Sequence, residues 1–331
     1  MKKLLLTGII VLFAGLLPGR ISAQDTEVMK SKNLNYKRFA NVMPEEVKTI
    51  ALIAPGSYPS RDVYPQGIKL LKDAGYKLKI MPHAFVRQEK VARAPLSGRL
   101  SDFYAAWNDP EVDMILCLRG GLGSEELLDH IDWKKLKNRP GLYFQGFSDI
   151  TFINCALLSK KLGHPVAGPS VGTLPGLTDD SIAVMRAMHH GEQVGPIPLK
   201  TLVPGNCKGL PIAGLLSRLA IVTDKEYCPD TTGRIIFIEG VGIRAADVKA
   251  QLEKLLAKKF FDKAAGIVFC QFVRCNPADE VEKIIDEFAL KMKIPVYKGF
   301  PLGHTTRHYA VDLQRSAEIK DGKIVFPAVK K

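Results

Sequence analysis

Residues 142–151 read LYFQGFSDIT, and this stretch decides the fold class. Its first four residues form an apolar run typical of a β-strand, a Gly-x-Ser turn follows, and a helical pattern begins at Ile150. Such a turn presents the hydroxyl of Ser148 at a helix N-terminus, where backbone N–H groups and the helix dipole stabilise a developing oxyanion. Two interpretations stay open here. Ser148 is a nucleophile, or Ser148 or Asp149 is simply a helix N-cap, since Ile150 stands where the usual motif has a second glycine.

Apolar strand-like runs alternate with helical patterns on both sides of this stretch. The predicted strands cover residues 47–54, 76–80, 112–118 and 142–145, and the predicted helices cover 64–74, 100–107, 125–131 and 150–162. Alternation of this kind is typical of βαβ units and of a parallel sheet. The sequence therefore predicts an α/β fold whose N-terminal domain has a parallel, flavodoxin-like or Rossmann-like sheet.

A second α/β region follows a stretch interrupted by prolines. Its predicted strands are 234–238, 266–270 and 295–297, its predicted helices are 245–257 and 278–292, and short alternating runs up to Val325 indicate hairpin strands. The intervening prolines surround one predicted helix near residues 180–190. We therefore expect an irregular lead-in at 24–46, an N-terminal domain at 47–170, a linker at 171–205 and a C-terminal α/β domain at 206–331.

The N-terminus has the pattern of a secretory signal peptide. Lys2 and Lys3 precede an apolar run over residues 4–17, which is shorter than the roughly 20 residues of a membrane-spanning helix. Cleavage is predicted after Ala23, with export to the periplasm and no stable membrane insertion afterwards. An uncleaved anchor is the alternative. No lipobox cysteine lies nearby, which argues against lipidation.

The charge and the cysteines narrow the classes of partner. The formal net charge of +13 falls by three to +10 when residues 1–23 are removed, and a basic surface favours anionic partners. Lys and Arg residues are scattered, so no nucleic-acid site is predicted. Of six cysteines, Cys117, Cys155 and Cys270 lie in apolar runs and are expected to be buried thiols. Whether Cys207 and Cys228 form a disulfide stays open, and no spacing indicates a metal site.

A glycine-rich segment, residues 118–124 (LRGGLGS), also follows a predicted strand and begins a helix. Its glycines let the backbone approach a ligand closely and turn N–H groups toward an anion. The segment lacks the lysine and Ser/Thr ending of a phosphate loop, so nucleotide binding is a weak interpretation and no cofactor is predicted.

A nucleophilic serine needs a base, most often a histidine that a carboxylate orients. His304 lies in a glycine-flanked loop after a strand, where a catalytic base is often found. Glu239 ends the apolar run 235–238, at the edge where α/β proteins place functional groups, although a surface glutamate at a strand end is common. Three other histidines lie at helix ends and are interpreted as surface or capping residues: His164, His189 and His190.

Taken together, these segments resemble the LD-carboxypeptidase family, whose relatives include hydrolases that give immunity to microcin C. The resemblance runs from Ile50 to about Ile319. It rests on residues 53–57 (IAPGS), 119–124 (RGGLGS), 132–133 (DW), 146–151 (GFSDIT), 168–169 (GP), 238–239 (IE) and 300–304 (FPLGH).

The resemblance implies a serine peptidase with two α/β domains that usually forms a homodimer. Ser148 corresponds to the family nucleophile, His304 to its base and Glu239 to the carboxylate. The backbone N–H groups of Gly121 and Asp149 correspond to the oxyanion donors. The implied activity is release of the C-terminal D-alanine from murein tetrapeptides, without a cofactor or metal.

Two departures from the family pattern concern the substrate pocket. Leu215 stands where relatives often have asparagine, and residues 246–250 lack the arginine pattern that often follows the glutamate. The candidates for substrate binding are Arg119, Gly120, Arg244 and Arg307. Three other classes stay open: an amide hydrolase of the microcin C immunity type, a non-catalytic muropeptide-binding protein and a nucleotide-binding α/β protein. The sequence also leaves open whether the two domains hold Ser148 and His304 apart until substrate binds.

Overall fold

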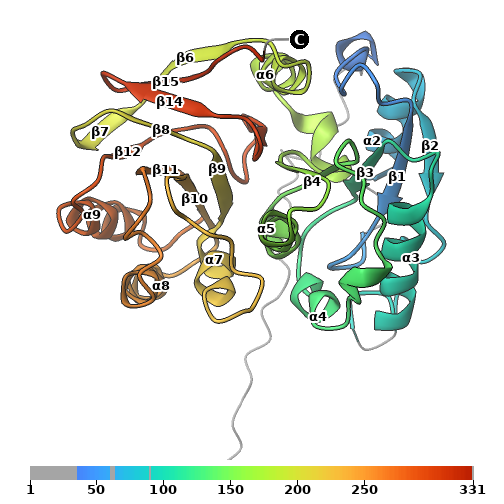
Figure 1. Cartoon of the computed structure of the whole chain (residues 1–331), viewed down its shortest axis with the longest axis horizontal. Helices are drawn as coiled ribbons and strands as arrows, with labels where there is room; N and C mark the ends of the chain where they lie inside the picture. The colour runs from blue at the N-terminus through green and yellow to red at the C-terminus, as the bar shows by residue number, and fades with distance from the viewer. Residues whose placement is uncertain (1–35, 60–63, 89–90, 330–331) are drawn as a thin grey trace, which may run out of the picture. The chain divides into compact units, whose positions relative to one another are not determined.

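Two blocks of strands and helices make up the part of the chain that the computed structural model describes, which is residues 36–59, 64–88 and 91–329 (Figure 1). The predicted signal peptide, residues 1–23, and the lead-in up to residue 35 lie outside the described residues. Within the described ranges, no helix is long and apolar enough to span a membrane.

The first block, called the first lobe below, is built on a sheet with the strand order β13-β5-β4-β3-β1-β2. All its neighbouring strands run parallel except β13, which is antiparallel to β5. Its strands are β1 (Thr49–Ile53), β2 (Lys77–Ile80), β3 (Met114–Cys117), β4 (Tyr143–Gly146), β5 (His164–Ala167) and β13 (Val311–Asp312).

Helices cover both faces of this sheet, which explains why its central strands are apolar throughout. In β1, Ile50 and Leu52 pack in one cluster with α2 and α6, while Ala51 and Ile53 pack in another with α3 and α5. The helices of this lobe are α2 (Tyr64–Asp73), α3 (Leu96–Asn108), α4 (Ser124–Leu128), α5 (Thr151–Lys160) and α6 (Asp179–His189), with short 3-10 turns η1 (Tyr36–Phe39), η2 (Trp133–Lys135), η3 (Ser148–Ile150) and η4 (Val171–Gly176).

The second lobe has two sheets. A mostly parallel sheet has the order β7-β12-β11-β10-β9, and an antiparallel sheet has the order β6-β15-β14-β8. Their strands are β6 (Val194–Pro198), β7 (Lys200–Val203), β8 (Cys207–Gly209), β9 (Pro211–Leu215), β10 (Ile235–Val241), β11 (Gly266–Val273), β12 (Val296–Lys298), β14 (Ala317–Lys320) and β15 (Lys323–Phe326).

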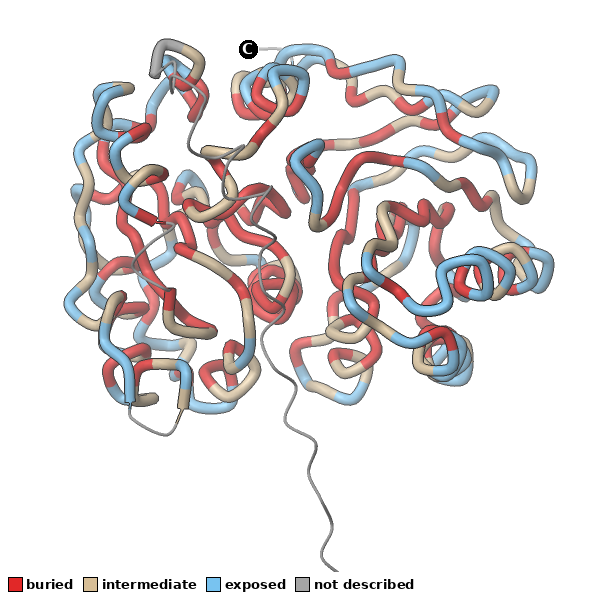
Figure 2. The backbone as a smooth tube through the Cα atoms, turned by 180° about the vertical axis from the view of Figure 1, so that it is seen from behind, coloured by how far each residue is buried: buried red, intermediate tan, exposed pale blue. Residues whose placement is uncertain are grey.

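Alternate residues of β10 pack on opposite layers. Ile235 and Phe237 lie in a cluster with residues of the antiparallel sheet, while Ile236 and Ile238 face helices α7 (Leu216–Val222), α8 (Ala245–Ala257) and α9 (Ala278–Ala289). Helix α9 buries residues at helical spacing and carries acidic residues in its first turn, which suits the helix dipole. Figure 2 shows the resulting pattern, with buried central strands and exposed residues on the outer helices and edge strands.

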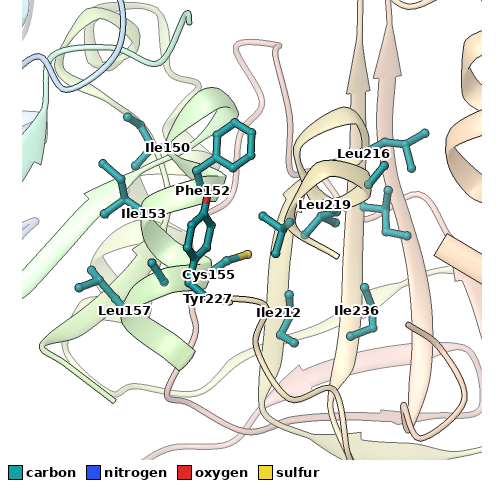
Figure 3. Packing of buried hydrophobic residues seen from close by; sticks show 14 of the residues in the cluster. Ile150, Phe152, Ile153, Cys155, Leu157, Ile212, Leu216, Leu219, Tyr227 and Ile236 are labelled. Atoms are coloured by element: carbon teal, nitrogen blue, oxygen red, sulfur yellow. The ribbon is translucent and has the colours of Figure 1, made fainter. Parts of the chain in front are cut away.

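A continuous apolar cluster joins the two lobes. Figure 3 shows Phe152 and Cys155 of α5 facing Leu219 of α7 and Ile212 of β9. Gly214 lets the lobes approach, because a Cβ there would lie 2.3 Å from the Thr151 side chain. The two lobes are therefore held together by a packed core as well as by the chain that connects them.

The structure confirms the predicted α/β class. Helix α8 has the predicted bounds, and β14 and β15 form the predicted hairpin. The stretch expected as a linker around one helix also contains two strands, since β6 pairs with β15 and β7 pairs with β12 in the two sheets of the second lobe. Strands β5, β8, β9 and β13 and helix α7 were not predicted from the pattern of apolar residues. All six cysteines are free thiols, and Cys117, Cys155 and Cys270 are buried as expected.

One histidine prediction was wrong. His189, interpreted as a surface or capping residue, is buried between Val42 and Gln145: its Nδ1 lies 2.9 Å from the Val42 carbonyl oxygen and its Nε2 lies 2.8 Å from Gln145 Oε1. Burial lowers the pKa of His189 to about 4. The end of α6 lies against the sheet, so that His189 in its last turn faces Gln145 of β4. His164 and His190 are partly exposed; Asp312 binds His164, and His190 bonds to the Asn41 carbonyl.

Candidate active site

Ser148 lies in the tight connection between β4 and α5, called the nucleophile turn below (residues 146–151). Its φ of 64° is in the left-handed region, which is strained for a residue with a side chain and is typical of a serine on a sharp strand-to-helix turn. Gly146 makes room for the turn, since a Cβ there would lie 2.9 Å from the Ile150 side chain. The turn can therefore carry isoleucine in place of the second glycine, because Gly146 leaves room for the Ile150 side chain.

Glu239 lies near the C-terminal end of β10 and is 1% exposed. The pairing of β10 with β11 shifts register between Ile238 and Gly240, so the carboxylate lies at a bulge in the strand. Bulges often redirect a side chain beside a functional site. Gly303 allows the neighbouring loop to pass close by, since a Cβ there would lie 3.2 Å from Glu239 Oε2.

His304 connects Ser148 to Glu239. It belongs to residues 299–309, called the histidine loop below. Its Nδ1 is 2.7 Å from Glu239 Oε2, and its Nε2 is 3.0 Å from Ser148 Oγ. With the carboxylate accepting from Nδ1–H, Nε2 is free to accept the proton of the serine hydroxyl, which is the arrangement a general base needs. The structure thus brings the three predicted residues into one hydrogen-bonded chain, already assembled across the two lobes.

The glycine-rich segment runs directly beside the nucleophile. A Cβ on Gly120 would lie 2.9 Å from both Ser148 Cβ and Asp149 N, and a Cβ on Gly121 would lie 2.3 Å from Ser57 Oγ. Ser57 fixes the segment, because its N–H donates to the Gly120 carbonyl and its hydroxyl accepts from Leu122 N–H. Within the described residues, the backbone N–H groups of Gly121 and Asp149 have no hydrogen-bond acceptor. Both are available to an oxygen atom of a ligand.

The chain's relatives agree with this geometry. Residues 50–166 match a family model described as the LD-carboxypeptidase N-terminal domain, and residues 208–319 match the LD-carboxypeptidase C-terminal domain. The chain belongs to the LD-carboxypeptidase family. It is a serine-type carboxypeptidase, so the family and the enzyme class predicted from the sequence are confirmed.

Two curated relatives of this LD-carboxypeptidase family member match it over nearly the whole of their own length. A probable murein peptide carboxypeptidase of Bacillus subtilis is 27% identical over 300 residues, which are 86% of this chain and 92% of the relative. The murein tetrapeptide carboxypeptidase of Pseudomonas aeruginosa is 26% identical over 302 residues, which are 83% and 94% of the two chains.

Solved structures share the fold. The muramoyltetrapeptide carboxypeptidase from Oxalobacter formigenes has a TM-score of 0.74 at 26% identity, covering 85% of this chain and 100% of that one. The microcin C7 self-immunity protein in its apo state has a TM-score of 0.75 at 19% identity, covering 87% and 98%. The latter likeness concerns the fold alone.

The arginines predicted as substrate-binding candidates in this LD-carboxypeptidase differ in their partners. Arg244 is exposed and pairs with Asp247 at 2.8 Å. Arg307 pairs with Asp180 at 2.7 Å and donates to the Tyr309 hydroxyl. Arg119, next to Gly120, reaches only the Tyr58 carbonyl oxygen, at 3.4 Å, and has no carboxylate partner within the described ranges.

The sequence analysis missed Arg218 of α7. Its guanidinium lies 2.9 Å from Asp149 Oδ1 and 3.2 Å from the Gly121 carbonyl oxygen. An arginine in a mostly apolar helix (LSRLAIV) was the available signal, since a charge in such a position needs a buried partner.

A second histidine of the loop, His308, lies against the same aromatic ring as His304. The rings of His304 and His308 are 4.8 Å and 4.5 Å from the ring of Phe147, centroid to centroid. His308 is fully buried, and burial lowers its pKa to about 3. In the part of the chain that the structure describes, neither ring nitrogen of His308 has a hydrogen-bond partner. Among the same residues, no group of three or more His, Cys, Asp or Glu side chains is placed to bind a metal ion.

Proposed function

We propose that this protein is an exported LD-carboxypeptidase that removes the C-terminal D-alanine from murein tetrapeptides during peptidoglycan turnover. The observation that carries the proposal is the chain of contacts Glu239–His304–Ser148, with distances of 2.7 Å and 3.0 Å, beside two backbone N–H groups that have no acceptor among the described residues. The substrate class comes from the curated relatives that are named as murein peptide and murein tetrapeptide carboxypeptidases.

The first chemical step is acylation of Ser148. His304 Nε2 takes the hydroxyl proton as Ser148 Oγ attacks the carbonyl carbon of the L,D-peptide bond, and Glu239 stabilises the imidazolium that forms. The carbonyl oxygen becomes an oxyanion that accepts hydrogen bonds from Gly121 N–H and Asp149 N–H. The C–N bond then breaks, His304 returns the proton to the leaving amine, and D-alanine departs.

Deacylation uses the same groups. A water molecule gives a proton to His304 Nε2 and attacks the ester carbonyl, and the proton returns to Ser148 Oγ as the C–O bond breaks. The shortened peptide leaves with a new carboxylate. Because the triad is assembled across a packed lobe junction, the catalytic groups need no domain closure before the attack.

Arg119 is our choice for the group that binds the carboxylate of the substrate's terminal D-alanine. A free carboxylate in a site requires a cation or N–H donors. Arg119 lies in the glycine-rich segment, directly before Gly120, and lacks an acidic partner within the described residues, whereas Arg244 and Arg307 each already pair with an aspartate.

Mass spectrometry of a muropeptide panel tests the function. Purified residues 24–331 are incubated with tripeptide, tetrapeptide and pentapeptide stems, with Ser148→Ala as the control. We expect the wild type alone to remove one D-alanine from the tetrapeptide. A wild type that cleaves no L,D-bond in the panel contradicts the substrate assignment.

Export and assembly belong to the same proposal and have separate tests. Sequencing the N-terminus of protein recovered from the periplasm should begin at Gln24, after cleavage at Ala23. Sedimentation of the mature protein should give the mass of a homodimer. A full-length cytoplasmic chain, or a monomer at all concentrations, contradicts the respective part.

A further inference from the structure

Arg218 is a largely buried cation beside the site that the mechanism above does not use. It lies in the first turns of α7, a helix of the second lobe, with its side chain 15% exposed. The guanidinium carbon lies 5.7 Å from the centre of the Phe152 ring. Packing on the Phe152 ring thus restricts the long Arg218 side chain in addition to its hydrogen bonds.

The first of those bonds goes to the residue that follows the nucleophile. Arg218 Nε lies 2.9 Å from Asp149 Oδ1, and the Asp149 side chain is 1% exposed. The other carboxylate oxygen, Oδ2, accepts from the backbone N–H of Ser124 at 3.0 Å and lies 2.8 Å from the Ser124 hydroxyl. The Asp149 side chain is therefore held from both ends, and the backbone N–H of the same residue is one proposed oxyanion donor.

The second bond goes to the glycine-rich segment. Arg218 Nη2 donates to the carbonyl oxygen of Gly121 at 3.2 Å. Gly121 supplies the other proposed oxyanion donor. One planar guanidinium therefore binds both residues whose N–H groups are the proposed oxyanion donors, although they lie on separate turns of the first lobe.

We propose that Arg218 is a positioning residue for the oxyanion hole, one that sets the spacing of the Gly121 and Asp149 N–H groups from the second lobe. The inference rests on the proposed function and extends it. Its consequence is that the second lobe contributes to both halves of the chemistry: Glu239 and His304 serve the proton transfer, and Arg218 serves the oxyanion.

A purely structural role for Arg218 has to be separated from this one, because removing a cation from a buried carboxylate destabilises a fold. Lys225 offers a matched control. It pairs with Glu125 of α4 at 2.7 Å and so also joins the two lobes, but it contacts neither Gly121 nor Asp149. Lys225→Met removes a cation from the lobe junction without touching the proposed oxyanion donors.

The experiment measures kcat and KM for tetrapeptide cleavage by the mature protein, residues 24–331, carrying Arg218→Lys, Arg218→Met or Lys225→Met. Loss of one oxyanion donor costs about 100- to 1,000-fold in kcat, so we expect a loss of about 10- to 100-fold for Arg218→Met, which leaves the donors present but unbraced. KM should change by less than about threefold because ground-state binding is not affected. Arg218→Lys should lie between wild type and Arg218→Met, and Lys225→Met should match the wild type.

Two further measurements decide between positioning and stability. Added guanidinium ion at millimolar concentration should partly restore kcat to Arg218→Met. The double variant Asp149→Asn with Arg218→Met removes the unpaired buried charge; it should fold as the wild type does and remain slow. Full recovery of kcat in that double variant, or an equal loss in Lys225→Met, overturns the proposal.

The rate at which a fluorophosphonate labels Ser148 separates this inference from the choice of substrate. The phosphonyl oxygen uses the same N–H donors, so labelling should slow in Arg218→Met even if the muropeptide assignment fails. Wild-type protein that labels quickly but cleaves no muropeptide contradicts the proposed function alone. Equal labelling rates in wild type and Arg218→Met contradict the role of Arg218 alone.

Discussion

The nucleophile turn and the histidine loop meet in one hydrogen bond, between Ser148 and His304, but they are held in different ways. The turn lies between a strand and a helix, and the Asn154 amide donates to the Gly146 carbonyl at 3.1 Å. None of the residues 299–309 is in a helix or strand. Scattered backbone bonds, such as the one from Gln271 N–H to the Leu302 carbonyl, hold this loop together with side chains. The Gln271 amide donates to the Arg307 carbonyl, and Asp180 accepts from Arg307 and from the Tyr309 hydroxyl.

This difference shows that the nucleophile and the base of a serine hydrolase place different demands on the fold. The nucleophile needs one backbone geometry, which a short local sequence can specify. The base needs two hydrogen-bond partners on other elements, so its position depends on residues far away in the chain. Perturbing the turn should therefore affect the chemistry directly, and perturbing the loop should act mainly through how well it is held.

The largest effect should come from removing either end of the shared hydrogen bond. Ser148→Ala and His304→Ala should each lower kcat for tetrapeptide by at least about 10,000-fold, because the two residues act as one unit. The double variant should be no slower than the slower single variant. Single-turnover kinetics with purified proteins measure these rates, and circular dichroism checks that each variant is folded. A double variant slower by the product of the single effects contradicts the shared role.

Gly120→Ala should have the next largest effect, and it acts on the side of the nucleophile turn. The added methyl group would lie 2.9 Å from Ser148 Cβ and from Asp149 N, and these atoms cannot move without moving the turn. We expect kcat to fall about 100-fold, as on loss of one oxyanion donor, with the protein still folded. Gly141→Ala is the control, since nothing lies within 4 Å of a Cβ there. Similar kcat values for the two variants would be evidence against a tightly fitted oxyanion loop.

Features formed by contiguous residues were predicted from the sequence, and contacts between residues far apart in the chain were missed. The turn around Ser148 was recognised because its strand, glycine and helix are contiguous, and the resemblance to the family then supplied roles for Glu239 and His304. Arg218 was missed because its partner Asp149 is 69 residues away. His189 was misinterpreted for the same reason, since its partners Val42 and Gln145 are 147 and 44 residues away. No periodicity in the chain reports such contacts.

Arg119, beside the nucleophile turn, and Arg307, in the histidine loop, extend the comparison of the two regions to substrate binding. Arg119→Met should raise KM for tetrapeptide about 10- to 100-fold with a smaller change in kcat, since a charge-assisted bond to the terminal carboxylate is lost. Arg307→Met should raise KM less, because Arg307 is already paired with Asp180 on the outside of the histidine loop. Initial rates over a range of tetrapeptide concentrations give both constants. The reverse order would assign carboxylate recognition to the histidine loop.

The smallest effect concerns the buried histidine of the same loop and appears in stability. The pKa of His308 is about 3 in the fold because burial disfavours the charged form, and the nearby His304 lowers it further; the ordinary value is 6.5. A lowered pKa means that the unfolded chain binds the proton first. The stability due to neutral His308 is therefore present above pH 6.5 and is lost as the pH falls toward 3.

His308→Leu should therefore make unfolding less sensitive to acid. Between pH 7 and pH 5.5 the linkage amounts to about 1 kcal/mol for this one residue, and His189, with a pKa of about 4, contributes a similar amount. Urea unfolding at the two pH values measures the difference, which should shrink in His308→Leu and shrink again when His189→Leu is added. An unchanged difference in His308→Leu would mean that His308 has the same pKa in the folded and the unfolded protein. Burial against Phe147 would then not keep the His308 ring neutral, and His308 would not contribute to the loss of stability in acid.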